Sequence, residues 1–258
     1  MIDLSDKVTI VTGGTRGIGA AIVGMCAGLG AQVVFTGRDE AAGAAVLADI
    51  TATSGQARYL QGDITAPGFP DRLVDEVIGH EGRIDILVNN AGILSRGDAT
   101  DCTDAEWESV METNVTAVFR MCRAIVPIMR KQFGETGQRG SIVNIASDWA
   151  LVAAQNAVAY GASKGAIAQL TRSMAIDHAK DGIRVNAVCP GDTETDMLLS
   201  ERGDEARGLV LARLGQSIPL GRVAQPAEIA AAVAFLASDA AAFITGIMLP
   251  VDGGHTAW

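Results

Sequence analysis

The chain has 258 residues, a formal net charge of −10 at pH 7, 48% hydrophobic residues and only 4% aromatic residues. No basic stripe offsets the negative charge, which argues against a nucleic-acid partner. The length allows one large α/β domain or two small ones, and it is enough to bury a sizeable core. Because no linker, low-complexity run or internal repeat divides the chain, we expect a single domain over residues 1–258.

The N-terminus and the apolar runs argue against export and membrane insertion. The first seven residues, MIDLSDK, hold neither a basic leader nor an apolar core, so no signal peptide is expected. No apolar run reaches the ~18 residues that a membrane span needs, so we expect no membrane partner. The four cysteines lack metal-ligand spacing, which predicts a reduced, cytoplasmic setting and no metal site. The three histidines are far apart, and a surface or capping role is expected for His80, His178 and His255.

The chain opens on the pattern of a dinucleotide-binding unit. A β-branched run at residues 8–11 leads into the turn TGGTRGIG at residues 12–19, and residues 20–29 continue with a helical pattern. Glycines allow a tight turn and a close backbone approach, while the N-terminus of the helix attracts phosphate. A second strand is expected at residues 32–36, at the right distance for this unit. We therefore interpret the turn as a nucleotide site rather than a plain strand-to-helix loop.

Strands and helices alternate along the rest of the chain. One further strand is expected to end at residues 62–63, and others to cover residues 84–88, 141–146, 183–188 and 246–249. Helices are expected at residues 40–53, 67–79, 104–111, 115–132 and 227–237, the last opened by Pro226. Near-continuous apolar strands between amphipathic helices are typical of a parallel sheet covered on both faces. We therefore predict an α/β fold, a Rossmann-type doubly wound parallel sheet.

Polar residues follow two of these strands. Asp63 ends one, and Asn89-Asn90-Ala91-Gly92 ends another. Ligands of a doubly wound sheet lie beyond the carboxyl ends of its strands, so these residues are candidates for adenosine contacts. Asp, Asn and Gly are also ordinary turn formers, which is the alternative interpretation. Asn114 lies at the junction of two expected helices, where its side chain needs hydrogen-bond partners. An asparagine in such a position often marks a kink or a bound water.

The stretch from Ser147 to Lys164 is the strongest candidate for catalysis. Tyr160 and Lys164 are four residues apart, so on a helix they share a face. A free Tyr ionises near pH ~10, and a nearby cation favours its phenolate form, as a general base working near neutrality requires. Ser147 directly follows an expected strand, which would aim its hydroxyl at the same place. The alternative is a helix that happens to carry an exposed Tyr and Lys.

The segment 192–222 is a long insertion after the strand at residues 183–188. It mixes Leu, Arg, Gly and Asp, and has only a modest helical pattern at residues 205–214. Such an insertion near strand ends is typical of a mobile lid or substrate loop.

Together these features resemble the short-chain dehydrogenase/reductase family over essentially the whole chain. The resemblance rests on six motifs in order: TGxxxGxG at residues 12–19, NNAG at 89–92, Asn114, Ser147, YxxxK at 160–164 and PGxxxT at 190–195. It implies that Tyr160 donates or accepts the proton, Lys164 binds the nicotinamide ribose and lowers the Tyr pKa, Ser147 polarises the substrate oxygen, and Asn114 anchors a proton-relay water. It also implies a homotetramer built partly by the final helix and strand.

The resemblance extends to the cofactor. It implies a dinucleotide held by the glycine turn, the strand ends and the PGxxxT segment, with Thr195 at the nicotinamide carboxamide. The expected cofactor residues are Gly13, Thr15, Arg16, Gly17, Ile18, Gly19, Arg38, Asp63, Ile64, Asn90, Ala91, Gly92, Tyr160, Lys164, Pro190, Gly191, Thr193 and Thr195. Two positions depart from the family pattern, Ala150 where Gly is common and Thr193 where Ile or Val is common.

The residues after the second strand favour NADP over NAD. An NAD site of this fold places an acidic side chain there to bind the ribose hydroxyls, and the corresponding residue is Gly37. Arg38 follows it, and Arg16 lies in the glycine turn, so two guanidiniums are expected near a 2′-phosphate. The alternative is that Arg38 pairs with Asp39 and Glu40, which would leave NAD as the cofactor.

The reaction class expected is NAD(P)-dependent interconversion of a secondary alcohol and a ketone by hydride transfer. A 3-oxoacyl-thioester reductase is the alternative, and a dinucleotide sensor without turnover is disfavoured by the intact catalytic set. The substrate is expected to be a small molecule, and a polyol, a sugar, a cyclic alcohol or an apolar ketone would each be compatible with the sequence. Leu94, Trp149, Leu198 and Leu199 suggest a partly apolar pocket, while Asp148 and Glu194 could bind hydroxyls. For the terminal Trp258, packing against a neighbouring subunit and a frayed end are both open.

Overall fold

The computed structural model describes residues 2–137, 139–200 and 206–257. Its strands form one seven-stranded sheet in the order β3-β2-β1-β4-β5-β6-β7, and every pairing is parallel. The strands are β1 Val8–Thr12, β2 Gln32–Gly37, β3 Gln56–Gln61, β4 Ile86–Asn89, β5 Gly140–Ile145, β6 Ile183–Pro190 and β7 Met248–Val251. The predicted doubly wound parallel sheet is therefore confirmed.

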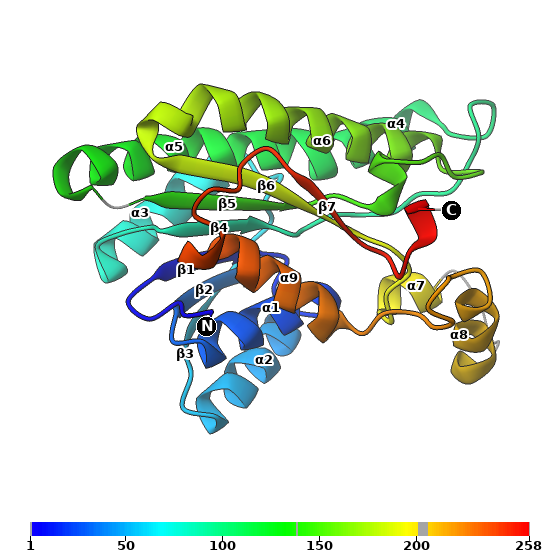
Figure 1. Cartoon of the computed structure of the whole chain (residues 1–258), viewed down its shortest axis with the longest axis horizontal. Coiled ribbons are helices and arrows are strands. Elements are labelled where there is room, and N and C mark those ends of the chain that lie inside the picture. Colours follow the sequence, from blue (N-terminus) through cyan, green and yellow to red (C-terminus); the bar gives the residue numbers. More distant parts are fainter. Residues whose placement is uncertain (1, 138, 201–205, 258) are drawn as a thin grey trace.

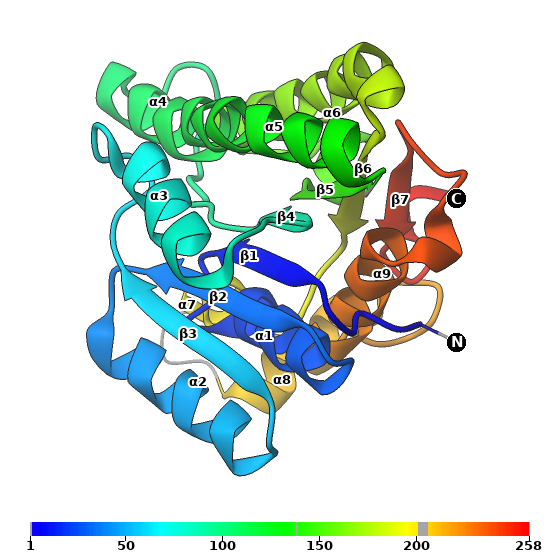
Figure 2. The ribbon, with the colours of Figure 1, turned by 90° about the vertical axis from the view of Figure 1, so that its left-hand side faces the viewer.

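Helices cover both faces of the sheet (Figures 1 and 2). They are α1 Gly17–Gly28, α2 Glu40–Ala52, α3 Phe69–Glu81, α4 Asp104–Met111, α5 Ala117–Thr136, α6 Val158–His178, α7 Asp196–Ser200, α8 Arg207–Gly215 and α9 Pro226–Ala237. Residues of α3, α5 and α6 pack on one face, and residues of α1, α2 and α9 on the other. Consecutive strand residues belong to opposite cores, as Ile10 and Val11 do, which is why the strands are apolar throughout.

The strand order reverses between β1 and β4, and this reversal determines where a ligand can bind. The chain runs outward from β1 to β2 and β3, then returns to the other side of β1 to form β4. Connections therefore diverge at the carboxyl ends of β1 and β4, and a crevice opens between them. Thr12 and Asn89 end these two strands and lie at this edge.

Most element boundaries agree with the sequence pattern, and the differences have local causes. Helix α1 begins at Gly17, within the glycine turn, rather than at Ala20. The final strand begins at Met248 because Gly246 adopts a left-handed turn conformation, with φ of 79°. Helix α7 was not predicted, because five residues are too few to display a period. Within residues 192–222, the helix expected over 205–214 begins at Arg207; Glu205 and the terminal Trp258 lie outside the described residues.

Asn114 lies in a π-helical turn, Glu112–Thr116, between α4 and α5. The one extra residue in this turn interrupts the regular α-helical hydrogen bonding between the two helices, and such turns are frequent at functional sites. The expected helix over residues 115–132 thus begins at Ala117 and extends to Thr136. The sequence interpretation of Asn114 as a junction residue agrees with this geometry.

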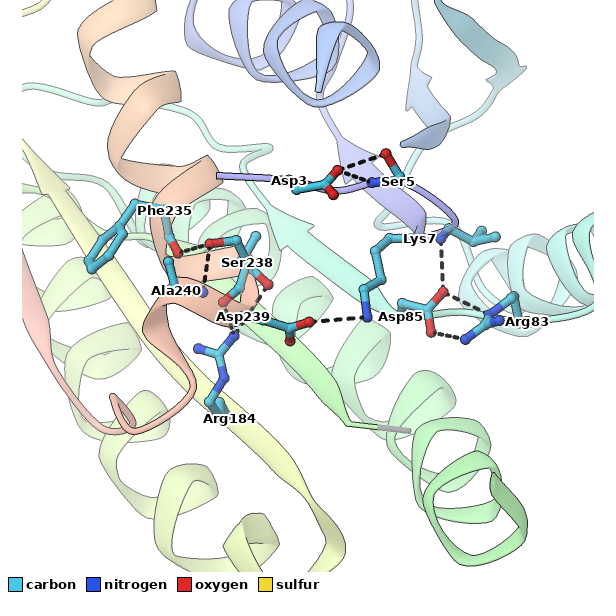
Figure 3. Close-up of polar contacts among 12 residues, drawn as sticks. Asp3, Ser5, Lys7, Arg83, Asp85, Arg184, Phe235, Ser238, Asp239 and Ala240 are labelled. Atoms are coloured by element: carbon cyan, nitrogen blue, oxygen red, sulfur yellow. Dashed lines mark hydrogen bonds and ion pairs between the residues drawn. The ribbon is translucent and has the colours of Figure 1, made fainter. Parts of the chain in front are cut away.

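Polar contacts close the amino-terminal edge of the sheet, opposite the crevice (Figure 3). Asp85, immediately before β4, accepts a hydrogen bond from Val8 N at 2.9 Å and pairs with Arg83 at 2.9 Å. Burial raises the pKa of the Asp85 carboxyl above its ordinary value, although these donors act in the opposite direction. Lys7 lies 3.7 Å from Asp239, beyond the end of α9. These contacts join the start of β1 to β4 and to the C-terminal part of the chain.

The glycine turn between β1 and α1 is close-packed at one position. A Cβ atom on Gly19 would lie 2.0 Å from the carbonyl oxygen of Gly13, a distance that no real Cβ contact shows. Gly13 itself has φ of 65°, in the left-handed region that glycine adopts without strain. By contrast, a Cβ on Gly24, further along the same helix, would meet nothing within 4 Å.

These two glycines give a matched test of the turn. We expect Gly24→Ala to raise the free energy of unfolding by roughly 0.5–1 kcal/mol, because Ala is the better helix former and the site is open. Gly19→Ala should lower it, because the new methyl group displaces the Gly13 carbonyl. Urea unfolding of both variants measures the difference, and the same sign of change in both would show that the turn is not close-packed in solution.

Candidate active site

A cavity of about 760 Å³ opens at the carboxyl edge of the sheet. A volume of this size is within the range of small-molecule and cofactor sites. Every residue expected to bind the cofactor lines this cavity, as do Ser147, Tyr160 and Lys164. The residues that line it and were not assigned to the cofactor include Leu94, Arg96, Asp148, Trp149, Met197 and Leu198. Asn114 is not among the lining residues.

The glycine turn is held in shape by the residues after β4. Asn90 Nδ2 donates to the carbonyl oxygens of Thr12 at 3.0 Å and Gly13 at 2.9 Å. In return, Thr12 Oγ1 accepts from the backbone N–H groups of Asn90 and Ala91. The Asn90 side chain is thus committed to the turn itself, so its contribution to a ligand site is to shape the cradle.

The cradle fits a dinucleotide phosphate. The N-cap residue of α1, Arg16, makes no side-chain hydrogen bond to the helix, so the N–H groups of its first turn are available to an anion at the cavity. The backbone at Gly13 comes so close to residue 19 that this residue must be glycine, because a Cβ atom there would lie 2.0 Å from the Gly13 carbonyl oxygen. The backbone geometry therefore suits the pyrophosphate of a nicotinamide dinucleotide.

Around the expected 2′-position of the adenosine ribose, the cavity is bounded by two arginines and an acidic residue. Arg16 pairs with Asp39 at 2.5 Å, and both side chains are largely exposed. Arg38 lines the cavity beside Asp63. A Cβ on Gly37 would lie 2.6 Å from Thr15 Cγ2, so this position has no room for a carboxylate unless Thr15 moves.

Asp63 stabilises a turn with its side chain, which was the alternative to a ligand contact. Its Oδ1 accepts from Thr65 N at 2.9 Å and from Thr65 Oγ1 at 2.7 Å. Burial alone raises the pKa of Asp63, but these hydrogen bonds and the charge of Arg38 lower it more, so the net pKa is below the ordinary value. Asp63 also lines the cavity, so the structural and ligand roles are compatible.

Lys164 is a buried cation beside Tyr160. Its side chain projects from α6 under the cavity, is 4% exposed, and donates from Nζ to the carbonyl oxygen of Ile145 at 2.8 Å. Nζ lies 5.4 Å from the centre of the Tyr160 ring. Burial lowers the pKa of Lys164 to about 8, so most molecules carry the ammonium form at pH 7. Tyr160 and Lys164 therefore lie on the same face of α6, as predicted, and the ammonium lies over the Tyr160 ring.

Asn114 links the loop after β4 to helix α6. Its Oδ1 accepts from Ile93 N at 2.8 Å, and its Nδ2 donates to Ile93 O at 2.9 Å and to Ser163 Oγ at 3.0 Å. Ser163 in turn donates to the carbonyl oxygen of Tyr160 at 2.7 Å. Gly92 separates Asn114 from the Lys164 ammonium, since a Cβ there would lie 3.2 Å from Asn114 Oδ1 and 3.7 Å from Lys164 Nζ.

Ser147 is engaged by its own neighbours. Its Oγ donates to Asp148 Oδ1 at 2.8 Å and accepts from Trp149 N at 3.2 Å. The Trp149 ring meets the Tyr160 ring edge to face, with centres 5.6 Å apart, and Arg96 lies 4.7 Å from the Trp149 ring centre. The aromatic pair thus forms one wall of the cavity beside the phenol.

His255, near the site, was missed by sequence reasoning, and so were Arg96 and Met197, which line the cavity. His255 Nδ1 lies 2.9 Å from Asp148 Oδ2, so the expectation of a surface or capping role for this histidine omits its main contact. The two residues are 107 positions apart, and no periodicity connects them. Glu194, suggested as a hydroxyl binder, is instead paired with Arg207 at 2.7 Å.

Among the described residues, no group of three or more His, Cys, Asp or Glu side chains could hold a metal ion. In the same part of the chain, none of the helices combines the length and apolar character that crossing a bilayer requires.

Comparisons with known sequences point to one family. The family model described as enoyl-(acyl carrier protein) reductase matches residues 13–256. A cyclopentanol dehydrogenase from Comamonas sp. is 41% identical over 256 residues, covering 98% of each chain. A 3-oxoacyl-(acyl-carrier-protein) reductase from Vibrio cholerae is 38% identical over 253 residues, again covering 98% of each chain.

Comparison with solved structures points to the same family as the sequence comparisons. A variant of actinorhodin polyketide ketoreductase with NADPH superimposes with a TM-score of 0.91 at 33% identity, covering 98% of both chains. The chain belongs to the short-chain dehydrogenase/reductase family and is an NAD(P)-dependent oxidoreductase of alcohols and ketones, as its six motifs predicted.

Proposed function

We propose that Tyr160 is the general acid/base of this oxidoreductase. The observation that supports it is the Lys164 ammonium, buried 5.4 Å from the centre of the Tyr160 ring. An ammonium in a water-excluded position stabilises a phenolate more strongly than it would in solvent, because the local dielectric constant is low. Tyr160 is half-buried and borders the cavity, so its hydroxyl can exchange a proton with a bound alcohol or ketone.

The other residues of the set have complementary roles in this proposal. The bound nicotinamide supplies the hydride acceptor or donor. Ser147 orients the substrate oxygen, and Lys164 binds the nicotinamide ribose while it favours the phenolate form of Tyr160. Asn114 maintains the distance between the loop after β4 and α6. By resemblance to the family, it also anchors a water that receives the proton. The glycine turn, the strand ends and Pro190 to Thr195 hold the dinucleotide.

Two substitutions separate the roles of tyrosine and lysine. Tyr160→Phe removes the transferable proton but keeps the ring that packs on Trp149, so turnover should fall by about 100-fold or more with cofactor affinity nearly unchanged. Lys164→Ala should reduce both turnover and cofactor affinity. Steady-state rates and cofactor dissociation constants from fluorescence titration measure the two effects. A Tyr160→Phe variant that keeps more than about a tenth of the wild-type rate would contradict the assignment.

For the cofactor, we favour NADP(H). The support is the absence of a carboxylate at Gly37, the packing of Thr15 against that position, and two arginines on the same side of the cavity. A similar structure contains NADPH. Arg16 is paired with Asp39 here, so it must share its guanidinium or turn from that carboxylate to contact a 2′-phosphate. Arg38 is therefore the main phosphate reader in this proposal, and NAD is the alternative cofactor.

The ratio of catalytic efficiencies with the two cofactors tests this preference. Arg38→Ala should lower kcat/KM with NADP by about tenfold to a hundredfold and leave kcat/KM with NAD almost unchanged, because only the phosphate loses its partner. Arg72→Ala, which removes an exposed arginine of α3 outside the cavity, is the control and should change neither. A wild-type preference for NAD, or a ratio unaffected by Arg38→Ala, would refute the role of the arginines.

The substrate class that fits best is a small cyclic secondary alcohol and its ketone. Leu94, Trp149, Met197 and Leu198 line the cavity with apolar side chains, and Trp149 packs on the Tyr160 ring. A relative that is 41% identical is a cyclopentanol dehydrogenase. A 3-oxoacyl thioester is the second candidate, supported by the 38% identical reductase. A panel of cyclic alcohols, cyclic ketones, polyols and a 3-oxoacyl thioester, assayed with both cofactors, decides between them.

We also propose that the enzyme is a homotetramer. Phe243, between α9 and β7, is completely exposed in the single chain, and Ile247, four residues further along the chain, is 39% exposed. Exposed apolar side chains that form a contiguous patch mark a surface that another protein covers. The final helix and strand, which the family resemblance assigns to an interface, are the elements on either side of Phe243.

A charge at this surface should dissociate the assembly. Phe243→Asp is expected to shift the sedimentation coefficient to a smaller species, because a carboxylate would be buried without a partner in the interface. Thr51→Asp, which adds the same charge to the exposed face of α2 at the other end of the sheet, is the matched control. An unchanged sedimentation profile for Phe243→Asp would remove this surface from the interface.

A further inference from the structure

A chain of three polar side chains links the catalytic serine to the C-terminal segment. Ser147 Oγ donates to Asp148 Oδ1 at 2.8 Å, and Asp148 Oδ2 lies 2.9 Å from His255 Nδ1. Asp148 is 5% exposed, so its carboxylate depends on these donors rather than on water. Oδ1 already accepts from Ser147 and from Trp149 N, at 2.9 Å. The carboxylate is the acceptor throughout, so the hydrogen of the histidine contact lies on Nδ1.

The position of His255 is set by a second buried carboxylate. Asp252 Oδ1 accepts from Gly254 N at 2.9 Å, and its Oδ2 accepts from Thr256 N at 2.8 Å and Thr256 Oγ1 at 2.6 Å. These bonds fold residues 252–256 into a turn directly after β7. His255 lies between the two anchored residues, so its ring is presented to Asp148 by a rigid element rather than by a free tail.

This arrangement decides what Ser147 can offer to a ligand. A serine hydroxyl has one hydrogen, and in this structure it is donated to Asp148. In that state Oγ can accept a hydrogen bond from an alcohol, but it cannot donate one to a ketone. Binding a ketone, or the partly charged oxygen of the transition state, requires the Ser147 hydrogen to rotate away from Asp148. The buried carboxylate then loses one of its donors.

His255 compensates for that loss. With Ser147 rotated, Asp148 retains Trp149 N on Oδ1 and His255 on Oδ2. Without His255, the carboxylate would keep one donor only, and its hold on the Ser147 hydrogen would be stronger. We infer that Asp148 and His255 form a positioning pair that controls the direction of the Ser147 hydroxyl and thereby the relative binding of alcohol and ketone. This inference rests on the alcohol/ketone chemistry proposed for the same site.

The inference predicts a specific kinetic pattern for His255→Ala. The enzyme–alcohol complex is unaffected, while the ketone complex and the transition state are both weakened by about three- to tenfold. This is less than the roughly tenfold to hundredfold that a whole hydrogen bond to a charged group is worth, because the bond is lost from both complexes and only its differential effect counts. Because the reaction equilibrium cannot change, kcat falls by this factor for alcohol oxidation with KM constant. For ketone reduction, KM rises by the same factor with kcat constant. His255→Gln, whose amide can donate to Asp148, should restore most of the wild-type values.

A merely structural role would give a different pattern. Loss of packing at the C-terminal turn would change KM for alcohol and ketone together, and glutamine would not rescue it. In the Asp148→Asn background, His255→Ala should have less than about a twofold effect, because the carboxylate that His255 supports is gone. Equal changes of KM for alcohol and ketone, or a full His255→Ala effect in the Asp148→Asn background, would overturn the inference.

Nuclear magnetic resonance tests the pair without any substrate. The chain has three histidines, His80, His178 and His255. The ring nitrogen signals of His255 are therefore identified as those that disappear in His255→Gln. We expect Asp148→Asn and Ser147→Ala each to shift the His255 signals while those of His80 and His178 stay in place. Signals of His255 that are unmoved by Ser147→Ala would refute the link. If no alcohol or ketone is turned over, the proposed reaction fails while this measurement still decides the pair.

Discussion

The buried ammonium of Lys164 is the constraint on which the rest of the site depends. A cation that is 4% exposed must be compensated, and the protein supplies the carbonyl oxygen of Ile145 at 2.8 Å. An ammonium has three hydrogens, so hydrogen-bonding capacity remains for groups in the cavity. Ile145 ends β5 and Lys164 lies in α6, so this one bond also fixes the helix that carries Tyr160 against the strand that leads to Ser147.

The surrounding structure supports this geometry through buried side-chain amides. Asn89 Nδ2 donates to Asn144 Oδ1 at 2.9 Å, and Asn144 Nδ2 donates to Thr171 Oγ1 at 2.9 Å. These residues belong to β4, β5 and α6 and are fully buried. Each bond replaces a contact with water that burial removed, so the network specifies one relative position of the three elements. The same logic applies to Asn114 and Asn90, whose side-chain amides orient the loop after β4 and the glycine turn.

Sequence reasoning succeeded where the physical cause is local. Strands buried on both faces are apolar at every residue, and the glycine turn and the spacing of Tyr160 and Lys164 are each readable within a few positions. It failed where the cause is a contact between distant residues. Nothing near His255 indicates that the ring lies on Asp148, and nothing near Glu194 indicates that Arg207 occupies its carboxylate. Such contacts depend on how the chain after β6 and the chain after β7 return to the strand ends, which the sequence pattern alone does not specify.

The packing of α1 against α9 has a consequence for synthesis of the chain. The two helices lie side by side on one face of the sheet (Figure 1), and Ile22, Val23 and Cys26 of α1 share a core with Ile229 and Val233 of α9. During translation, α1 leaves the ribosome some 200 residues before its partner, a separation that follows from their positions in the sequence. The part of its apolar surface that α9 covers therefore lacks its native cover until the chain is almost complete, although β1, β2 and α2 cover the rest. The nucleotide-binding half of the molecule, although it is made first, depends on the last elements made to shield it from other nascent chains.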